Sequence, residues 1–471
     1  MLKTVSAVAV AAALLAPTIA QAQEEPRAAH TDRHTLAQTA GYRALYTCTA
    51  TFLANISQDR LEADIFANYD SRGRVTQKDV TVDHANKRVL VRYLDDMPPR
   101  IAVWRPLLGC VQLPIGTSPD VAFPLPTAPE GLQTPDYTQR DWPLGDRNAV
   151  ARIPARQKAA LDAVVARAFD GTYGGVTWAV IVVKDGKIIA ERYDRGYDMH
   201  TPQRTNSAAK SMAATLVGIA QKKGLVDIMK PGVLAEWRRP GDPRGAITLN
   251  DLLHMSSGLY TEASGNPQQE LYRSGASAAE RSALNVMDSK PGTRWVYAGS
   301  DTILSVRAIR QAINDDKAFL AWPFQELFWK IGMTHTTPET DWTGDFLMSG
   351  QLWSTARDFA RFGLLYINDG VWQGERILPE GWAKYVATPA PDQPKGRDGR
   401  GYGAQFWLFG PKQGLPEGSY TPAGARGQYA MIVPSKGVIV VRRGFDKNNE
   451  AFEIPRFTAD VLKVLDGEGS K

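Results

Sequence analysis

A serine and a lysine three positions apart are the residues of this chain best suited to carry out chemistry. Ser207 and Lys210 lie in the segment TNSAAK (205–210), and nowhere else does a serine precede a lysine by three. Residues three apart share one face of a helix, with Cβ atoms about 5 to 6 Å apart, so the amine can reach the hydroxyl. Lysine can activate serine if burial lowers the lysine pKa from about 10.4. The spacing predicts a nucleophile and its base; the alternative is a second capping serine beside a lysine that extends into solvent.

A helix over 207–223 is expected to position this pair. Thr205 or Asn206 can cap it, which places Ser207 in the first turn, where backbone N–H groups are free and the helix dipole is positive. The residues of this helix are apolar on nearly all of its faces, and many of them are alanine. This pattern is typical of a central core helix. We therefore expect Lys210 to be buried, which is costly for an amine without a function.

Other catalytic signatures are missing from the sequence. It contains no Gly-x-Ser-x-Gly elbow and no His-Glu-x-x-His zinc pattern. Its six histidines form no recognisable triad or metal-ligand spacing, and we expect His200 and His254 to be structural or surface residues. Neither a metal nor a cofactor is expected.

Composition and targeting signals restrict the class of protein. Hydrophobic residues make up 43% and charged residues 22%, close to globular averages. The net charge of +5 is spread along the chain without runs of Lys and Arg, so nucleic acid is not an expected partner. Residues 1–22 combine Lys3, a short apolar stretch and the small residues Ala20 and Ala22, which predicts a cleaved signal peptide. We expect a periplasmic or secreted protein with no transmembrane segment.

The two cysteines, Cys48 and Cys110, have two interpretations. Export to an oxidising compartment favours a disulfide between them. Cysteine is also often an isolated core residue, so two separately buried thiols remain an alternative.

A small α+β region is expected at 23–145, after the signal peptide. The sequence predicts a helix over 43–66, and then three alternating segments that form an antiparallel meander: 78–84, 87–95 and 100–106. Pro, Thr, Gly and Asp over 116–146 are typical of a linker.

The rest of the chain, 146–471, is expected to form one α+β domain. Hairpins are predicted at 175–194, around Asp185-Gly186, and at 428–444. Between them the sequence predicts mostly helices: 207–223, 248–254, 301–314 and 355–366. Strands at both ends that enclose a helical middle indicate one antiparallel sheet, formed by the first and last hairpins and flanked by helices. A doubly wound sheet would need strands interleaved with the helices.

Six segments in order resemble a known family, the serine β-lactamase and penicillin-binding protein superfamily. They are SAAK (207–210), ITLNDLLHMSSGL (247–259), PGTRWVYAGS (291–300), the segment 354–382, GYGAQFWL (401–408) and GARGQYAMIVPSKGVIVVRRG (424–444). The resemblance covers about residues 170–446 and is greatest to the class C-like branch, which includes esterases and hydrolases of 6-aminohexanoate oligomers. It implies a β-lactamase/transpeptidase-like fold.

The resemblance also implies roles for particular residues. Ser207 would be the acylated nucleophile, Lys210 its base, and Tyr297 the tyrosine that passes the proton to the leaving group. A phenol near a cationic lysine would be drawn toward the phenolate; the alternative for Tyr297 is a place in an aromatic cluster with Trp295. The oxyanion would be held by the backbone N–H of Ser207 and one N–H near Gly427-Gln428.

The sequence departs from the lactamase pattern at the substrate pocket. On the strand that carries Lys-Thr-Gly in lactamases it has Ala423-Gly424-Ala425-Arg426-Gly427-Gln428, with no lysine, and it has Tyr297-Ala298-Gly299 in place of Tyr-x-Asn. Arg426 could bind a substrate carboxylate or face solvent. Neither Tyr260 nor Tyr272 falls clearly at the position of the second tyrosine that nylon-oligomer hydrolases use.

The sequence therefore predicts a serine hydrolase that cleaves small-molecule esters or linear amides through an acyl-enzyme. The alternatives are a β-lactamase or D,D-peptidase, and a non-catalytic sensor of the same fold. The oligomeric state, the physiological substrate and the role of the N-terminal region stay open.

Overall fold

The computed structural model describes residues 33–66, 75–261, 272–394, 399–447 and 450–467. The expected signal peptide at 1–22 lies outside these residues. Among the described helices, none has both the length and the apolar character needed to cross a membrane.

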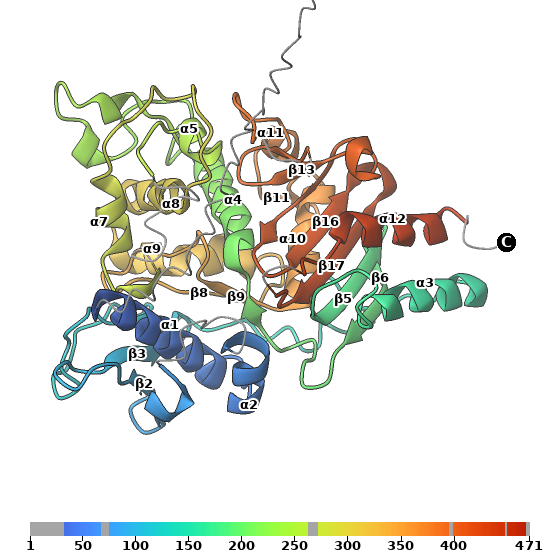
Figure 1. The fold of residues 1–471 in the computed structure, drawn as a ribbon. Coiled ribbons are helices and arrows are strands. Elements are labelled where there is room, and N and C mark those ends of the chain that lie inside the picture. The colour runs from blue at the N-terminus through green and yellow to red at the C-terminus, as the bar shows by residue number, and fades with distance from the viewer. Residues whose placement is uncertain (1–32, 67–74, 262–271, 395–398, 448–449, 468–471) are drawn as a thin grey trace, which may run out of the picture.

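The N-terminal region is a helix packed on a four-stranded antiparallel sheet (Figure 1). Its elements are α1 (Arg33–Phe52), α2 (Gln58–Leu61), β1 (Val80–Asp83), β2 (Arg88–Val91), β3 (Arg100–Arg105) and β4 (Gly109–Gln112). The predicted meander is present, and β4 extends it by a strand that the alternation did not reveal. The predicted helix over 43–66 begins ten residues earlier, at Arg33, and α1 ends at Phe52.

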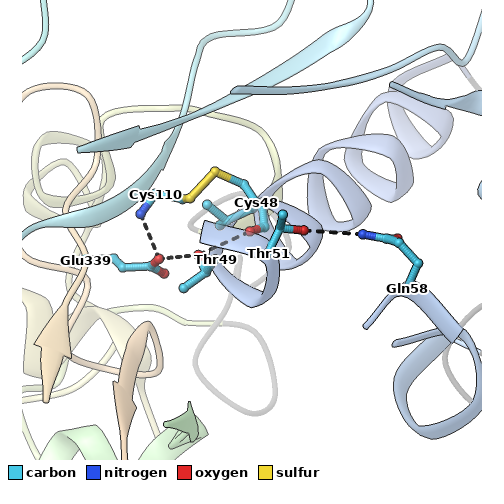
Figure 2. The surroundings of a disulfide bond; sticks show 7 residues. Cys48, Thr49, Thr51, Gln58, Cys110 and Glu339 are labelled. Atoms are coloured by element: carbon cyan, nitrogen blue, oxygen red, sulfur yellow. Dashed lines mark hydrogen bonds between the residues drawn. A yellow bond between two sulfur atoms is a disulfide. The ribbon is translucent and has the colours of Figure 1, made fainter. Parts of the chain in front are cut away.

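A disulfide joins Cys48 of α1 to Cys110 of β4 (Figure 2). The predicted bridge is therefore present, and the alternative of two separate thiols is excluded. Both cysteines are fully buried in the core between the helix and the sheet. The bridge fixes α1 to the strand that ends the N-terminal sheet.

An eight-stranded antiparallel sheet forms the centre of the larger part, in the order β12-β13-β14-β16-β17-β5-β6, with β15 paired to β16. Its strands are β5 (Thr177–Lys184), β6 (Lys187–Tyr193), β12 (Gly401–Tyr402), β13 (Trp407–Phe409), β14 (Ser419–Thr421), β15 (Ala423–Gly424), β16 (Gln428–Val433) and β17 (Val438–Gly444). Both predicted hairpins are confirmed. They lie side by side because β17 pairs with β5, with Val440 opposite Val182.

Helices cover both faces of this sheet. On β5, Val180 and Val182 pack against α3 (Ala155–Arg167) and α12 (Ile454–Leu465). Their neighbours Ile181 and Val183 face the opposite core, with α4 (Ala209–Lys222) and α10 (Ala356–Ile367). Side chains alternate between the two faces of a strand, so a strand covered on both sides is apolar throughout its length.

The helical middle of the chain packs on the far side of α4 (Figure 1). It contains α5 (Leu249–Leu253), α7 (Ala278–Ala283), α8 (Gly299–Ile313) and α9 (Asp316–Pro323), while α11 (Trp382–Val386) follows later. Because α4 has the sheet on one side and these helices on the other, every residue from Ala209 to Ala220 is buried. The prediction of a central core helix is confirmed.

Two small sheets interrupt the middle, where the sequence suggested mostly helices. They are formed by β7 (Gln203–Arg204), β9 (Leu352–Ser354) and β8 (Thr337–Pro338), and by β10 (Val371–Trp372) with β11 (Glu375–Arg376). Strands of two or three residues are too short to show an alternating pattern.

The N-terminal region shares a core with the larger part. Tyr42 and Tyr46 of α1 cluster with Trp178 of β5, Trp353 of β9 and Phe445. The ring of Tyr46 lies edge-on to that of Trp353, with centroids 5.1 Å apart. Residues 116–146, expected as a linker, run over the larger part: Arg361 donates hydrogen bonds to the carbonyls of Pro143 and Gly145.

Candidate active site

Ser207 lies in a 3₁₀ turn (Asn206–Ala208) that leads directly into α4. The sequence placed it in the first turn of the helix, capped by Thr205 or Asn206. Neither side chain caps: the Thr205 hydroxyl donates to the carbonyl of Asn206, and the Asn206 amide donates to the carbonyl of Ala425. Asn206 instead ties the turn that carries the serine to the segment after β15.

Lys210 points back at this serine. Its Nζ lies 3.3 Å from Ser207 Oγ, and it also donates a hydrogen bond to the backbone carbonyl of Ser349. The side chain is buried, with 1% of its surface exposed, so the alternative of a lysine in solvent is excluded. Burial lowers the pKa of Lys210 to about 7, because a dry environment disfavours the ammonium form. The amine is therefore in part neutral near pH 7 and can accept a proton.

Tyr297 stands next to the pair, just before α8. The Lys210 amine lies 5.0 Å from the centre of its ring. Burial raises the pKa of Tyr297, and a hydrogen bond with Ser207 partly opposes that rise. We expected the phenol to be drawn toward the phenolate; burial has the opposite effect and keeps the phenol protonated.

Aromatic rings hold Tyr297 in place. Tyr297 shares a cluster with Trp295, Tyr402 and Trp407, in which the ring centroids of neighbouring pairs lie 5.0 to 6.3 Å apart. The cluster with Trp295, posed above as an alternative to a catalytic role, exists together with the contacts to Ser207 and Lys210. Such a cluster restricts the phenol to one position.

A cavity of about 180 Å³ opens beside Ser207. Tyr272 lines it, and its hydroxyl hydrogen-bonds to that of Ser349, the residue whose carbonyl binds Lys210. Burial raises the pKa of Tyr272 to about 12. A second tyrosine is therefore present at the site although its position in the sequence gave no clear sign of it, whereas Tyr260 is 52% exposed.

The segment after β15 forms another wall of the cavity, with Ala425 and Arg426 among the lining residues. Gly424 lies so close to the serine turn that a Cβ there would collide with the carbonyl of Thr205. The glycine thus permits a close approach of two backbones.

Gly427 and Gln428, the residues expected near the oxyanion, have other contacts. Gly427 has φ +85° and a Cβ there would collide with the Arg442 guanidinium. The Gln428 side chain is buried: it donates to the carbonyls of Arg426 and Gly444 and accepts from Arg443. These are side-chain contacts, so a backbone N–H near Gly427-Gln428 stays the predicted oxyanion donor, and the neighbouring Ala425 and Arg426 line the cavity.

Three further residues that the sequence did not single out line the cavity: Tyr42 of α1, Arg204 of β7 and Arg273. Arg204 lies three residues before Ser207, a proximity that could have drawn attention to it. Tyr42 belongs to the N-terminal region, and no sequence pattern connects it with residues so far along the chain.

The remaining titratable groups lie elsewhere. His254 hydrogen-bonds to the carbonyl of Asn250, and burial lowers its pKa; His200 pairs with His335 on the surface. Within the described ranges, no group of three or more His, Cys, Asp or Glu residues could hold a metal ion.

This fold and site define the class of protein. Residues 161–443, well over half of the chain, match the family model described as Beta-lactamase. The chain belongs to the beta-lactamase family of serine hydrolases, as the resemblance of its motifs implied.

Individual relatives agree with that class. A 6-aminohexanoate-dimer hydrolase of Paenarthrobacter ureafaciens is 23% identical over 288 residues, which are 56% of this chain and 72% of the relative. Among solved structures, a family VIII carboxylesterase superposes with a TM-score of 0.53 at 16% identity, over 67% of this chain and 99% of the other. A penicillin-binding protein homologue from Caulobacter crescentus gives a TM-score of 0.51 at 14% identity, over 67% and 98%. The structural matches establish the fold.

Proposed function

We propose that this protein cleaves ester or linear amide bonds of small molecules through an acyl-enzyme on Ser207. One observation carries the proposal: a fully buried lysine whose pKa is lowered to about 7 lies 3.3 Å from a serine hydroxyl at the edge of a cavity. A neutral amine in that position can take the hydroxyl proton as the oxygen attacks.

Acylation follows from these contacts. The Ser207 proton passes to Lys210 while Oγ bonds to the substrate carbonyl carbon, whose oxygen becomes the oxyanion. Backbone N–H groups of Ser207 and of the segment 425–428 would stabilise that charge. When the bond to the leaving group breaks, the Tyr297 phenol donates its proton to that group, and the Lys210 ammonium restores the phenol. Water then attacks the acyl carbon, its proton is taken up at Lys210, and Ser207 regains a proton as the acid departs.

The pocket favours esters and linear amides over lactams. The anchoring residues of lactamases are missing: the segment 423–428 has no lysine where lactamases carry Lys-Thr-Gly, and Tyr297-Ala298-Gly299 replaces Tyr-x-Asn. A β-lactamase or D,D-peptidase is the alternative activity of the same site. Fast nitrocefin turnover without ester or amide cleavage would make the β-lactamase the favoured activity.

Ser207→Ala is the direct test. We expect the wild type to hydrolyse 4-nitrophenyl esters or anilides and to gain one adduct from a fluorophosphonate probe, measured by intact mass. The variant should lose the adduct and at least 10³-fold in kcat/KM, because the side chain that forms the acyl-enzyme is removed.

Ser211→Ala is the matched control. Ser211 lies on the same helix, and its hydroxyl donates to the carbonyl of Gln405 away from the cavity, so labelling and turnover should persist. A wild type that is acylated at Ser207 but never released would identify the non-catalytic sensor. Absence of labelling in the folded wild type would reject the nucleophile.

We also propose that the protein is exported. The Cys48–Cys110 disulfide is compatible with an oxidising compartment. N-terminal sequencing of the mature protein should begin after Ala22.

A further inference from the structure

The cavity beside Ser207 is lined by arginines from three separate segments: Arg204 of β7, Arg273, and Arg426 after β15. None of the described residues that line it is Asp or Glu. A bound anion would interact favourably with the guanidinium groups that face this cavity.

Arg204 is positioned to bind a ligand. It is 7% exposed, and its Nε donates to the carbonyl of Gly350 at 3.0 Å. The guanidinium lies 5.5 and 5.6 Å from the ring centres of Tyr42 and Tyr46, which restrict its plane. Nε is the atom that bonds to described protein groups, so both Nη groups can donate to a ligand in the cavity.

Arg273 and Arg426 place two more cations around the same space. Arg273 lies 4.9 Å from the ring centre of Tyr42, on which Arg204 also packs. Arg426 donates one Nη1 hydrogen bond to the carbonyl of Asp446 and packs on Phe445, which also lines the cavity. All three stay charged because guanidinium does not lose its proton in proteins.

A carboxylate fits this arrangement. A planar guanidinium held at one edge offers two parallel N–H donors, the geometry that carboxylates match. A cavity of about 180 Å³ is small compared with drug-sized pockets, so the anionic group would belong to a short chain.

We propose that the substrate of this hydrolase carries a carboxylate on its acyl or alcohol part, and that Arg204, with Arg273 and Arg426, binds it beside Ser207. This inference rests on the proposed function and adds the substrate class to it. Arg204 would be the main residue that determines specificity, because it is oriented by Gly350 and by two tyrosine rings.

Two matched pairs of esters test the proposal, one for each side of the scissile bond. The acyl side uses mono-4-nitrophenyl adipate and its neutral counterpart, the 4-nitrophenyl ester of adipamic acid; the alcohol side uses 4-acetoxybenzoate and 4-acetoxybenzamide. We expect the wild type to prefer the charged member of one pair by about 10- to 100-fold in kcat/KM, the range of a hydrogen bond between charged groups. The preference should decrease with added salt.

Arg204→Met should remove most of that preference, because kcat/KM should fall further for the charged ester than for its neutral counterpart. Arg426→Gln should reduce the preference by a smaller factor, and exposed Arg195→Gln serves as the control without effect. If Arg204→Met fails to fold, the Arg426→Gln variant and the salt dependence of the wild type decide.

Failure of this inference and failure of the proposed function give different results. Equal rates on both members of both pairs, or an equal loss on both in Arg204→Met, would overturn the carboxylate site and leave the hydrolase intact. An unlabelled Ser207 would reject the hydrolase itself. If the enzyme hydrolyses all four esters slowly, protection from labelling replaces turnover as the measurement. Adipate should then slow the fluorophosphonate labelling of Ser207, whereas adipamide should not. Equal labelling rates with adipate and adipamide would overturn the carboxylate site.

Discussion

Lys210 shows how a single side chain acquires a function from its surroundings. Its spacing from Ser207 is local, but its pKa of about 7 comes from burial between the main sheet and the helical middle. The protein retains a buried amine whose charged form is disfavoured, and that penalty makes the amine a base near neutral pH.

We expect kcat/KM to rise with pH through about 7 and to level off above about 8. The reason is that only neutral Lys210 accepts the serine proton, and the neutral fraction increases as pH passes the pKa. A pH–rate profile with a neutral ester measures it. A midpoint near 10 would contradict the burial argument.

Lys210→Met checks the same pKa through stability. In the folded protein the pKa of Lys210 is about 7, below its ordinary value of 10.5. Between pH 7 and pH 10.5 the unfolded chain therefore binds more protons than the folded protein. The free-energy cost of burying the lysine decreases as the pH rises through this range. The inactive methionine variant should be more stable than the wild type, by more at pH 7 than at pH 10.

Tyr297→Phe should lower kcat by about 10² to 10⁴ with little change in KM, because the phenol is a proton donor to the leaving group and not a binding contact. Tyr402→Phe is the matched control: its ring belongs to the same cluster, 5.8 Å from that of Tyr297. Similar losses in both variants would indicate that removing either hydroxyl disturbs the site, and would contradict a specific role for the Tyr297 proton.

At the scale of elements, the link between α1 and β4 supports the site. Cys110 N–H donates to Glu339 Oε1 at 2.9 Å, and the Thr49 hydroxyl donates to the same oxygen (Figure 2). Burial raises the pKa of Glu339 to about 7. The carboxyl lies just after β8, so the disulfide region and the larger part meet at one buried group.

Removing the disulfide should reduce the free energy of unfolding by about 4 kcal/mol, because the bridge closes a loop between residues 62 apart in the chain. Urea denaturation of the wild type against Cys48→Ala/Cys110→Ala measures the difference. Activity should also disappear at lower urea, since α1 supplies Tyr42 to the cavity. A difference below about 1 kcal/mol would show that packing alone holds α1.

At the scale of the whole molecule, the N-terminal region and the larger part behave as one packed body. Their shared aromatic cluster and the contacts of Glu339 cross the boundary expected near residue 145. Arg100 and Arg105 add hydrogen bonds to the carbonyl of Arg273 and to Thr340. We infer that the N-terminal region completes the wall of the cavity.

We therefore expect a single unfolding transition. Far-UV circular dichroism, tryptophan fluorescence and fluorophosphonate labelling should change at the same urea concentration, because separating the two parts would expose the shared core. An early transition that leaves labelling intact would contradict this and indicate an independent N-terminal domain.

The amino-acid sequence by itself determined the features that depend on near neighbours. Alternation and an Asp-Gly turn predicted the hairpin of β5 and β6, apolar composition predicted the central helix, and spacing predicted Ser207 with Lys210. The order of six motifs indicated the family.

Only the tertiary structure decided the features that depend on residues far apart in the chain. The lysine pKa, the protonated Tyr297, the placement of Tyr272, and the meeting of Tyr42, Arg204, Arg273 and Arg426 around one cavity all arise from packing between distant segments. The physical reason is that burial and electrostatic environment are set by every element that surrounds a group, whereas periodicity and spacing record only the backbone on which the group stands.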